Sequence, residues 1–287
     1  MKLFLQLIVC TVLVQCSFAI LGFSRHNKFG RLNREPPFGS SIVSYETVQE
    51  KWIEQRLNNF DPQNNQTWKM RYYENSNYLQ NGGPVFIFVG GEWTASRGSL
   101  QAGHMHDMAR DLNGTMFYTE HRFYGKSKPT PDVTVANLRF LGMDQALADL
   151  ANFIVQMKAT IPEIRNSGVI LVGGSYSATM VTFFMQKYPH LASGAWSSSA
   201  PLNAQKDFIE YLEVVSEAIT IHGGDACANR IENAFAEMES LVAAENTDKI
   251  TQLFNLCRPL SEASALDMMS FFSDVSGGFS GLVQYHK

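Results

Sequence analysis

The feature that most constrains this chain is an aliphatic run that leads through two glycines to a serine. Residues 169–172 are four consecutive branched aliphatics, which predicts a strand buried on both faces. The two glycines allow a sharp turn, and Ser175 stands at its tip. Residues 176–185 then have the length of a helix and end before Pro189. This order is typical of a nucleophile elbow, in which the serine hydroxyl projects from the sheet beside a helix N-terminus.

The match to the usual elbow pattern, Gly-x-Ser-x-Gly, is incomplete because Ser177 occupies the last position. The alternative interpretation is a serine that caps the helix after a glycine turn. Small residues at Gly173, Ser177 and Ala178 favour the elbow, since the turn leaves no room for large side chains.

Other segments place this turn in a larger α/β pattern. Strands are expected at 67–73, 85–89, 116–119 and, as a fourth buried strand, within 194–201. Residues 143–158 predict a helix with an apolar face and with Asp149 off that face. Short apolar strands that alternate with helices predict a doubly wound, mostly parallel sheet. From Asn203 onward only helical patterns occur, at 208–221, 226–243, 249–254 and 261–272.

The chain is expected to divide into four parts. Residues 1–19 have an apolar run that ends Ser17-Phe18-Ala19, which predicts a signal peptide cleaved after Ala19. A membrane anchor is the alternative, but the run is short. Residues 20–58 predict a partly disordered leader segment, 59–202 the α/β core, and 203–287 a helical cap.

Net charge, cysteine spacing and glycosylation sequons limit the classes of binding partner and cofactor to be expected. A net charge of -4 over 287 residues offers no basic face for nucleic acid. Beyond the signal peptide the cysteines are Cys227 and Cys257, whose spacing fits no metal or redox motif, so neither metal nor cofactor is expected. They could pair with each other or with cysteines outside this chain. Sequons at Asn65 and Asn113 fit a secreted glycoprotein, although such triplets also arise by chance.

Four motifs in register extend the argument. They are Gly90-Gly91-Glu92, Glu120-His121-Arg122-Phe123-Tyr124-Gly125-Lys126-Ser127, Gly173-Gly174-Ser175-Tyr176 and Trp196-Ser197-Ser198-Ser199-Ala200-Pro201. In these motifs and their separations the chain resembles the serine peptidase family of prolylcarboxypeptidase, dipeptidyl peptidase II and thymus-specific serine protease, the last most of all. The resemblance covers about residue 60 to the C-terminus.

The resemblance implies an α/β-hydrolase fold and acyl transfer by Ser175. The backbone N–H groups of Tyr176 and of Gly91 (or its neighbour) would bind the oxyanion. Substrates would be peptide ends with proline beside the scissile bond, in a secreted or lysosomal setting, with no membrane contact after signal cleavage and a homodimer left open. Glu92 would bind a substrate ammonium or be a loop carboxylate satisfied by backbone N–H groups. His121 and Arg122 are expected in a buried polar network near the site.

The chain departs from the family pattern because no histidine stands where the catalytic base is expected. The fold orders its triad as Ser, then Asp or Glu, then His, and in the family both partners lie beyond the cap. After Ser175 only His190, His222 and His286 remain, and none follows a core strand, so no base is assigned. We therefore expect a truncated chain, inactive alone, with an unpaired sheet edge after 195–198. A partial gene model, a splice form and a decayed copy stay open, as do an esterase or lipase and a non-catalytic binding protein.

Overall fold

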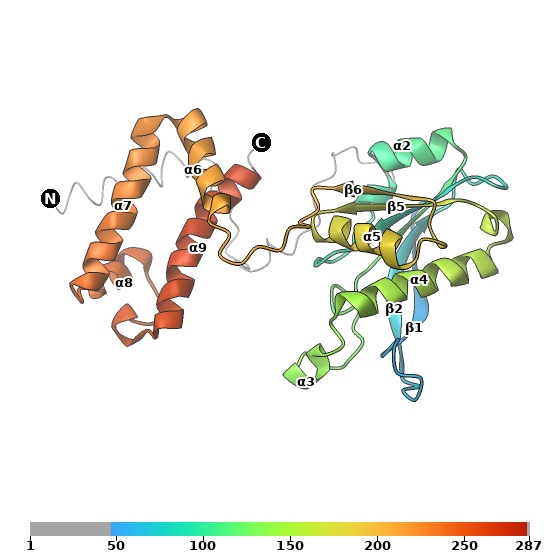
Figure 1. Ribbon diagram of the computed structural model, residues 1–287, viewed down its shortest axis with the longest axis horizontal. Coiled ribbons are helices and arrows are strands. Elements are labelled where there is room, and N and C mark those ends of the chain that lie inside the picture. The colour runs from blue at the N-terminus through green and yellow to red at the C-terminus, as the bar shows by residue number, and fades with distance from the viewer. Residues whose placement is uncertain (1–46, 286–287) are drawn as a thin grey trace. The chain divides into compact units, whose positions relative to one another are not determined.

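The apolar runs of the sequence form the middle of a six-stranded sheet in the computed structural model, which describes residues 47–285. The strands follow one another across the sheet in the order β1-β2-β4-β3-β5-β6 (Figure 1). Their bounds are β1 Gln49–Arg56, β2 Thr67–Asn75, β3 Val85–Val89, β4 Thr115–Thr119, β5 Val169–Gly174 and β6 Gly194–Ser198. The strands β4, β3, β5 and β6 are parallel, whereas β2 pairs antiparallel with both β1 and β4. The predicted α/β core with a mostly parallel sheet is confirmed.

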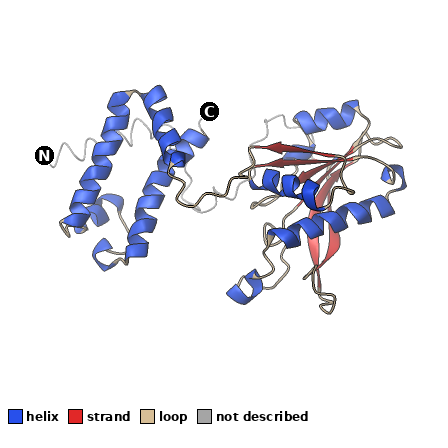
Figure 2. Ribbon diagram, in the orientation of Figure 1, coloured by secondary structure: helices blue, strands red, loops and turns tan. Residues whose placement is uncertain are grey.

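Helices cover both faces of this sheet, as Figure 2 shows by colour. They are α2 His104–Asp111, α4 Met143–Thr160 and α5 Tyr176–Lys187, with short 3-10 turns η2 Gly98–Leu100 and η3 Pro162–Ile164. The short helix α3, Val135–Leu138, has no buried residue and covers neither face. Parallel strands covered on both faces bury every side chain, which explains the unbroken aliphatic runs. In β3, Val85 and Ile87 join the core beneath α4 and α5, while Phe86 and Phe88 join the core beneath α2.

The chain divides into two compact units between Asn203 and Ala204. The second unit contains helices only: α6 Glu210–Gly223, α7 Asp225–Ala243, α8 Asp248–Phe254 and α9 Ala265–Gln284, with a 3-10 turn η4 at Leu260–Glu262. Its own small core centres on Met238, Ile250 and Leu260. Within residues 47–285 no helix combines the length and the apolar character needed to cross a bilayer.

Three expectations need correction. Residues 49–56, assigned to the leader segment, form the edge strand β1. Their polar sequence did not indicate a strand, because an edge strand is half exposed and needs few apolar side chains. The strand β6 is largely exposed rather than buried, and Trp196 keeps 39% of its surface; among the described residues β6 is an edge strand paired with β5. The last helix runs to Gln284 instead of ending near residue 272. The expected signal peptide at 1–19 lies outside the described residues.

Candidate active site

The candidate site lies where strands β3, β4 and β5 end. Parallel strands bring their carboxyl ends to one edge of a sheet. Phe88 of β3 pairs with Val172 of β5, so Gly91 and Ser175, each three residues further on, emerge at the same level. The turn Glu120-His121-Arg122 leaves the end of β4 beside them, because Val89 pairs with Thr119.

Ser175 has the backbone of a strained turn. Its φ of 58° and ψ of -128° lie where L residues rarely sit. Such strain costs about 1–3 kcal/mol and persists only where the surroundings enforce it. Its side chain is exposed and makes no capping hydrogen bond to helix α5. The helix-cap interpretation is therefore wrong. Among residues 47–285 the Ser175 hydroxyl has no hydrogen-bond partner.

The neighbours of Ser175 enforce this conformation. A Cβ on Gly173 would lie 2.4 Å from the backbone oxygen of Ser177, so the strand and the helix approach too closely for a side chain there. The buried Ser177 hydroxyl accepts from the Gly174 N–H and contacts the Gly174 carbonyl, each at 3.0 Å. The Ser175 N–H donates to the Ser198 carbonyl at 3.0 Å, which ties the turn to β6. Serine thus replaces the usual second glycine by bracing the turn through its hydroxyl.

Two backbone donors flank the serine. Tyr176 opens helix α5, where the first N–H groups have no intrahelical acceptor. Gly91 follows Gly90, whose backbone N–H donates to the Thr119 carbonyl at 3.0 Å. This hydrogen bond fixes the start of the loop that carries Gly91. Among the described residues neither the Tyr176 nor the Gly91 N–H has an acceptor. Both can therefore donate to an oxygen bound beside Ser175.

His121 is buried and orients Tyr176. Its Nδ1 lies 2.7 Å from the Arg122 carbonyl and must donate to it, so Nε2 accepts from the Tyr176 hydroxyl at 3.2 Å. Burial lowers the pKa of His121 to about 4. Burial also raises the pKa of Tyr176 to about 12. Both groups are therefore neutral at pH 7, and His121 has no free nitrogen for proton transfer from Ser175.

Glu92 is the unusual group of the site. Its Oε2 atom is buried and has no hydrogen-bond partner among the described residues. The interpretation that backbone N–H groups satisfy this carboxylate therefore does not hold for that oxygen. After the larger effect of burial, the Glu92 charge also raises the pKa of Tyr124. A carboxylate oxygen left in this state is costly unless a cation or donor reaches it.

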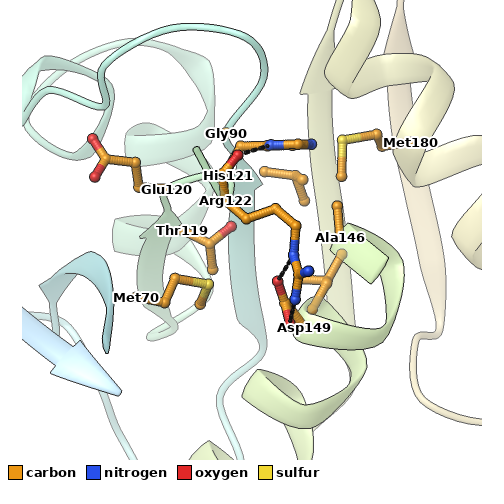
Figure 3. A pocket seen from close by; sticks show the side chains of 11 residues that line it. Met70, Gly90, Thr119, Glu120, His121, Arg122, Ala146, Asp149 and Met180 are labelled. Carbon is orange, nitrogen blue, oxygen red and sulfur yellow. Dashed lines mark hydrogen bonds and ion pairs between the residues drawn. The ribbon is translucent and has the colours of Figure 1, made fainter. Parts of the chain in front are cut away.

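Arg122 lies under the site with every donor used. Nε and one terminal nitrogen bind Asp149 of α4 at 2.7 and 2.8 Å. The other contacts are the carbonyls of Leu57 at 3.1 Å, Phe140 at 2.9 Å and Arg56 at 3.3 Å. Figure 3 shows this pair beside a cavity of about 10 Å³, room for about one water and not for a substrate. The expectation that Asp149 stands apart from the buried face is wrong, because Arg122 draws it inside.

None of the histidines in residues 47–203 lies within hydrogen-bond distance of the Ser175 hydroxyl. His190 is exposed beyond the end of α5. His222 belongs to α6 of the helical unit and is exposed. His286 lies outside the described residues.

The remaining predicted residues lie away from this edge. Asn65 and Asn113 are exposed, in the loops before β2 and β4. Cys227 and Cys257 are both free thiols, so the pairing of one with the other is not formed. The reason is placement: Cys227 lies in the first turn of α7, and Cys257 follows α8 beyond the other end of that 19-residue helix. Within residues 47–285 no three metal-binding side chains come together.

Comparison with known proteins shows the family of the chain. Residues 55–287 match the family model described as serine carboxypeptidase S28. A Caenorhabditis elegans relative named as a serine protease is 35% identical, covering 86% of this chain and 46% of that protein. The mouse (Mus musculus) thymus-specific serine protease is 32% identical, covering 86% and 49%. The bovine (Bos taurus) lysosomal Pro-X carboxypeptidase is 31% identical, covering 79% and 48%. The chain thus spans about half the length of the curated relatives it matches.

Proposed function

Because the chain belongs to the S28 family of serine carboxypeptidases, we propose that it supplies the nucleophile of a serine exopeptidase, with Ser175 forming the acyl-enzyme. One observation carries the proposal. The Ser175 hydroxyl is exposed and uncapped on a strained turn, beside two backbone N–H groups that have no acceptor in the described residues. A helix cap would use the hydroxyl as an acceptor and needs no strained backbone, whereas acyl transfer needs an accessible hydroxyl beside free N–H donors.

The proposed reaction has two halves. Ser175 Oγ attacks the scissile carbonyl carbon, its proton passes to a base, and the Tyr176 and Gly91 N–H groups hold the resulting oxyanion. The leaving amine takes up a proton as the C–N bond breaks, and water then hydrolyses the ester. We assign no residue of this chain as the base. We propose that acylation by Ser175 is slow unless a proton acceptor is supplied, since residues 47–285 place no base in hydrogen-bond contact with its hydroxyl.

Glu92 is proposed to select the substrate end. A substrate ammonium would satisfy the buried Glu92 Oε2, and hydrogen bonds between charged groups are the strong ones. A carboxylate at the same point would be repelled. This favours peptides taken from their amino end, with proline beside the scissile bond, over removal of a carboxyl-terminal residue. Since the bovine relative is named a Pro-X carboxypeptidase, the choice between the two ends is the sharper part of the proposal.

The setting is proposed to be secreted or lysosomal. The expected signal peptide at 1–19 and the exposed sequons at Asn65 and Asn113 support the secretory route. The bovine relative carries a lysosomal name.

The nucleophile is tested with a fluorophosphonate, which Ser175 attacks at phosphorus with loss of fluoride, while imidazole in the buffer accepts the proton. We expect one adduct by intact mass, located on Ser175 by peptide mapping and formed faster as imidazole is added. Ser175→Ala should give none. A folded protein that gives no adduct at any imidazole concentration, or an adduct that persists in Ser175→Ala, would overturn the proposal.

The role of Glu92 is tested with two activated proline-containing dipeptide esters, one with a free α-ammonium and one N-acetylated. We expect faster acylation of Ser175 by the free amine, by roughly tenfold for a hydrogen-bonded charge contact of about 1.5 kcal/mol. Glu92→Gln should remove that preference and leave the acetylated ester unchanged. Equal rates for both esters in the unaltered protein would refute the ammonium site but leave the nucleophile standing.

A further inference from the structure

The loop that carries the Gly91 donor, residues 90–95, is anchored to the end of β4 at several points. Its start is held by the Gly90 N–H on the Thr119 carbonyl at 3.0 Å. In its middle the Trp93 indole N–H donates to the Tyr118 hydroxyl at 2.7 Å. A Cβ on Gly90 would lie 2.4 Å from the Thr119 oxygen, so loop and strand end are in direct contact. We call residues 90–95 the donor loop.

The far end of the donor loop is held by a buried carboxylate. Glu120 Oε1 accepts from the Ala95 N–H at 3.1 Å and from the Arg71 guanidinium. Arg71 in turn donates to the Ala95 carbonyl at 3.3 Å. The N–H and the carbonyl of Ala95 therefore both hydrogen-bond to the Arg71–Glu120 ion pair. The side chains of Arg71 and Glu120 keep 4% and 0% of their surface, so neither group has water as an alternative partner.

The other carboxylate oxygen is fully used as well. Glu120 Oε2 accepts from Arg71 Nε at 3.2 Å, from the Lys126 N–H at 3.0 Å and from the Ser127 hydroxyl at 2.8 Å. At Gly125, where φ is +52°, a Cβ would lie 1.8 Å from Glu120 Oε1. Five donors and a glycine turn thus enclose one carboxylate. Such a group can neither rotate nor shift without losing several hydrogen bonds.

We propose that Glu120, paired with Arg71, is a positioning residue that fixes the oxyanion donor Gly91 by holding the Ala95 end of the donor loop. This inference rests on the proposed acyl transfer and adds a group that touches neither substrate nor reacting atoms. Glu120 acts through the backbone of the loop. An oxyanion donor stabilises the transition state only if its N–H is already aimed at the developing charge.

The molecule offers a matched control for the cost of breaking a buried ion pair. Asp149 with Arg122 is the second such pair, with side-chain exposures of 3% and 0%. The Asp149 side chain hydrogen-bonds to Arg122 and Asn59 and, within the described residues, to no group of the donor loop. In Figure 3 the Glu120 side chain points away from the side on which Asp149 lies. A variant at Asp149 therefore loses comparable stability without loosening Gly91.

The experiment compares Glu120→Gln with Asp149→Asn in the full chain, by fluorophosphonate labelling of Ser175 with imidazole present. In either orientation the amide opposes an NH₂ group to donors, those of Ala95 and Arg71 or those of Lys126, Ser127 and Arg71, and it removes the charge that pairs with Arg71, so the Ala95 end should come loose. We expect the maximal labelling rate of Glu120→Gln to fall by roughly 10- to 100-fold, short of the 10²–10³-fold that loss of a whole oxyanion donor costs. Its half-saturating probe concentration should not change, and Asp149→Asn should label within about twofold of the unaltered protein.

Arg71→Lys is a second variant that tests the same ion pair if Glu120→Gln does not fold. Lysine keeps the charge but loses the fork that reaches both Glu120 and the Ala95 carbonyl, so a smaller fall in maximal rate is expected. Equal rates in Glu120→Gln and Asp149→Asn, or a change confined to the half-saturating concentration, would overturn the positioning role. An unaltered protein that fails to label would instead overturn the proposed function, so the two failures are distinguishable.

Discussion

Replacing Arg122 by methionine should destabilise the α/β unit more than any surface substitution. Its guanidinium is completely buried and makes five hydrogen bonds, two of them to Asp149. Methionine fills similar space but leaves Asp149 with only the Asn59 side-chain amide as donor. It also strips the carbonyls of Leu57 and Phe140 of a partner. Breaking a buried pair from one side costs about 3–5 kcal/mol, out of a typical total of about 5–15 kcal/mol.

The size of the loss should depend on pH. Burial raises the pKa of the Asp149 carboxyl, and Arg122 opposes that rise. Without Arg122 the folded-state pKa of Asp149 rises further above its unfolded value. A carboxyl with a raised folded pKa takes up its proton more readily when folded, so the unfolding free energy falls as pH increases through that window. Arg122→Met should therefore lose more stability at pH 7 than at pH 4.

Urea unfolding followed by tryptophan fluorescence measures the effect selectively. All four tryptophans precede residue 204, so the signal reports on the α/β unit alone. At a urea slope of about 1–3 kcal/mol per molar, the midpoint should fall by at least about 1 M at pH 7. The double variant Arg122→Met, Asp149→Leu removes both charges and should recover most of the loss. A midpoint within about 0.3 M of the unaltered protein, or a double variant no better than the single one, would refute the reasoning.

Three further outcomes follow from the same structure. Because the folded pKa of His121 lies near 4, its contribution to stability is lost as pH falls from about 6.5 toward 4. In His121→Gln the urea midpoint should therefore change less with pH over that range, and a pH dependence equal to that of the unaltered protein would contradict this. Ser177→Ala removes the brace on Gly174 and should cost about 1–3 kcal/mol and slow fluorophosphonate labelling, whereas a loss of stability with unchanged labelling would show that the brace does not aim the serine. Alkylation with iodoacetamide should modify Cys257, which is exposed, before Cys227, which is half-buried, and mass under non-reducing conditions that lacks both adducts would indicate a disulfide.

The fold was largely predictable because its centre is buried on both faces. The runs at 85–89 and 169–172 are short continuous apolar stretches, which are typical of strands covered on both faces. The strand β1 was missed for the opposite reason. In Gln49–Arg56 only Ile53 and Gln55 are buried, so neither an apolar run nor strict alternation is present, and pairing with β2 defines the strand.

The site was predictable only where its chemistry is local. Ser175, its turn and its helix are consecutive in sequence, so the pattern contains the geometry. The network below it joins residues that are distant in sequence: Arg71 to Glu120 across 49 positions, and Arg122 to Asp149 across 27. In the sequence Asp149 is a polar residue off the apolar face of a helix, and no nearby residue indicates that it pairs with the buried Arg122.

The position of these ion pairs bears on why they are there. A buried pair is weak evidence for stability, because apolar residues of the same volume often do as well or better. Both pairs of the α/β unit nevertheless lie at the strand ends that carry the site. One fastens the donor loop through Ala95, and the other fixes α4 against the end of β4. An apolar pair would fill the same space but would leave the orientation of the loop backbone undefined, since dispersion contacts have no direction. The bidentate contact of Arg71 with Glu120 defines the orientation of the loop, whereas the contact of Arg122 with Asp149 only joins α4 to the end of β4.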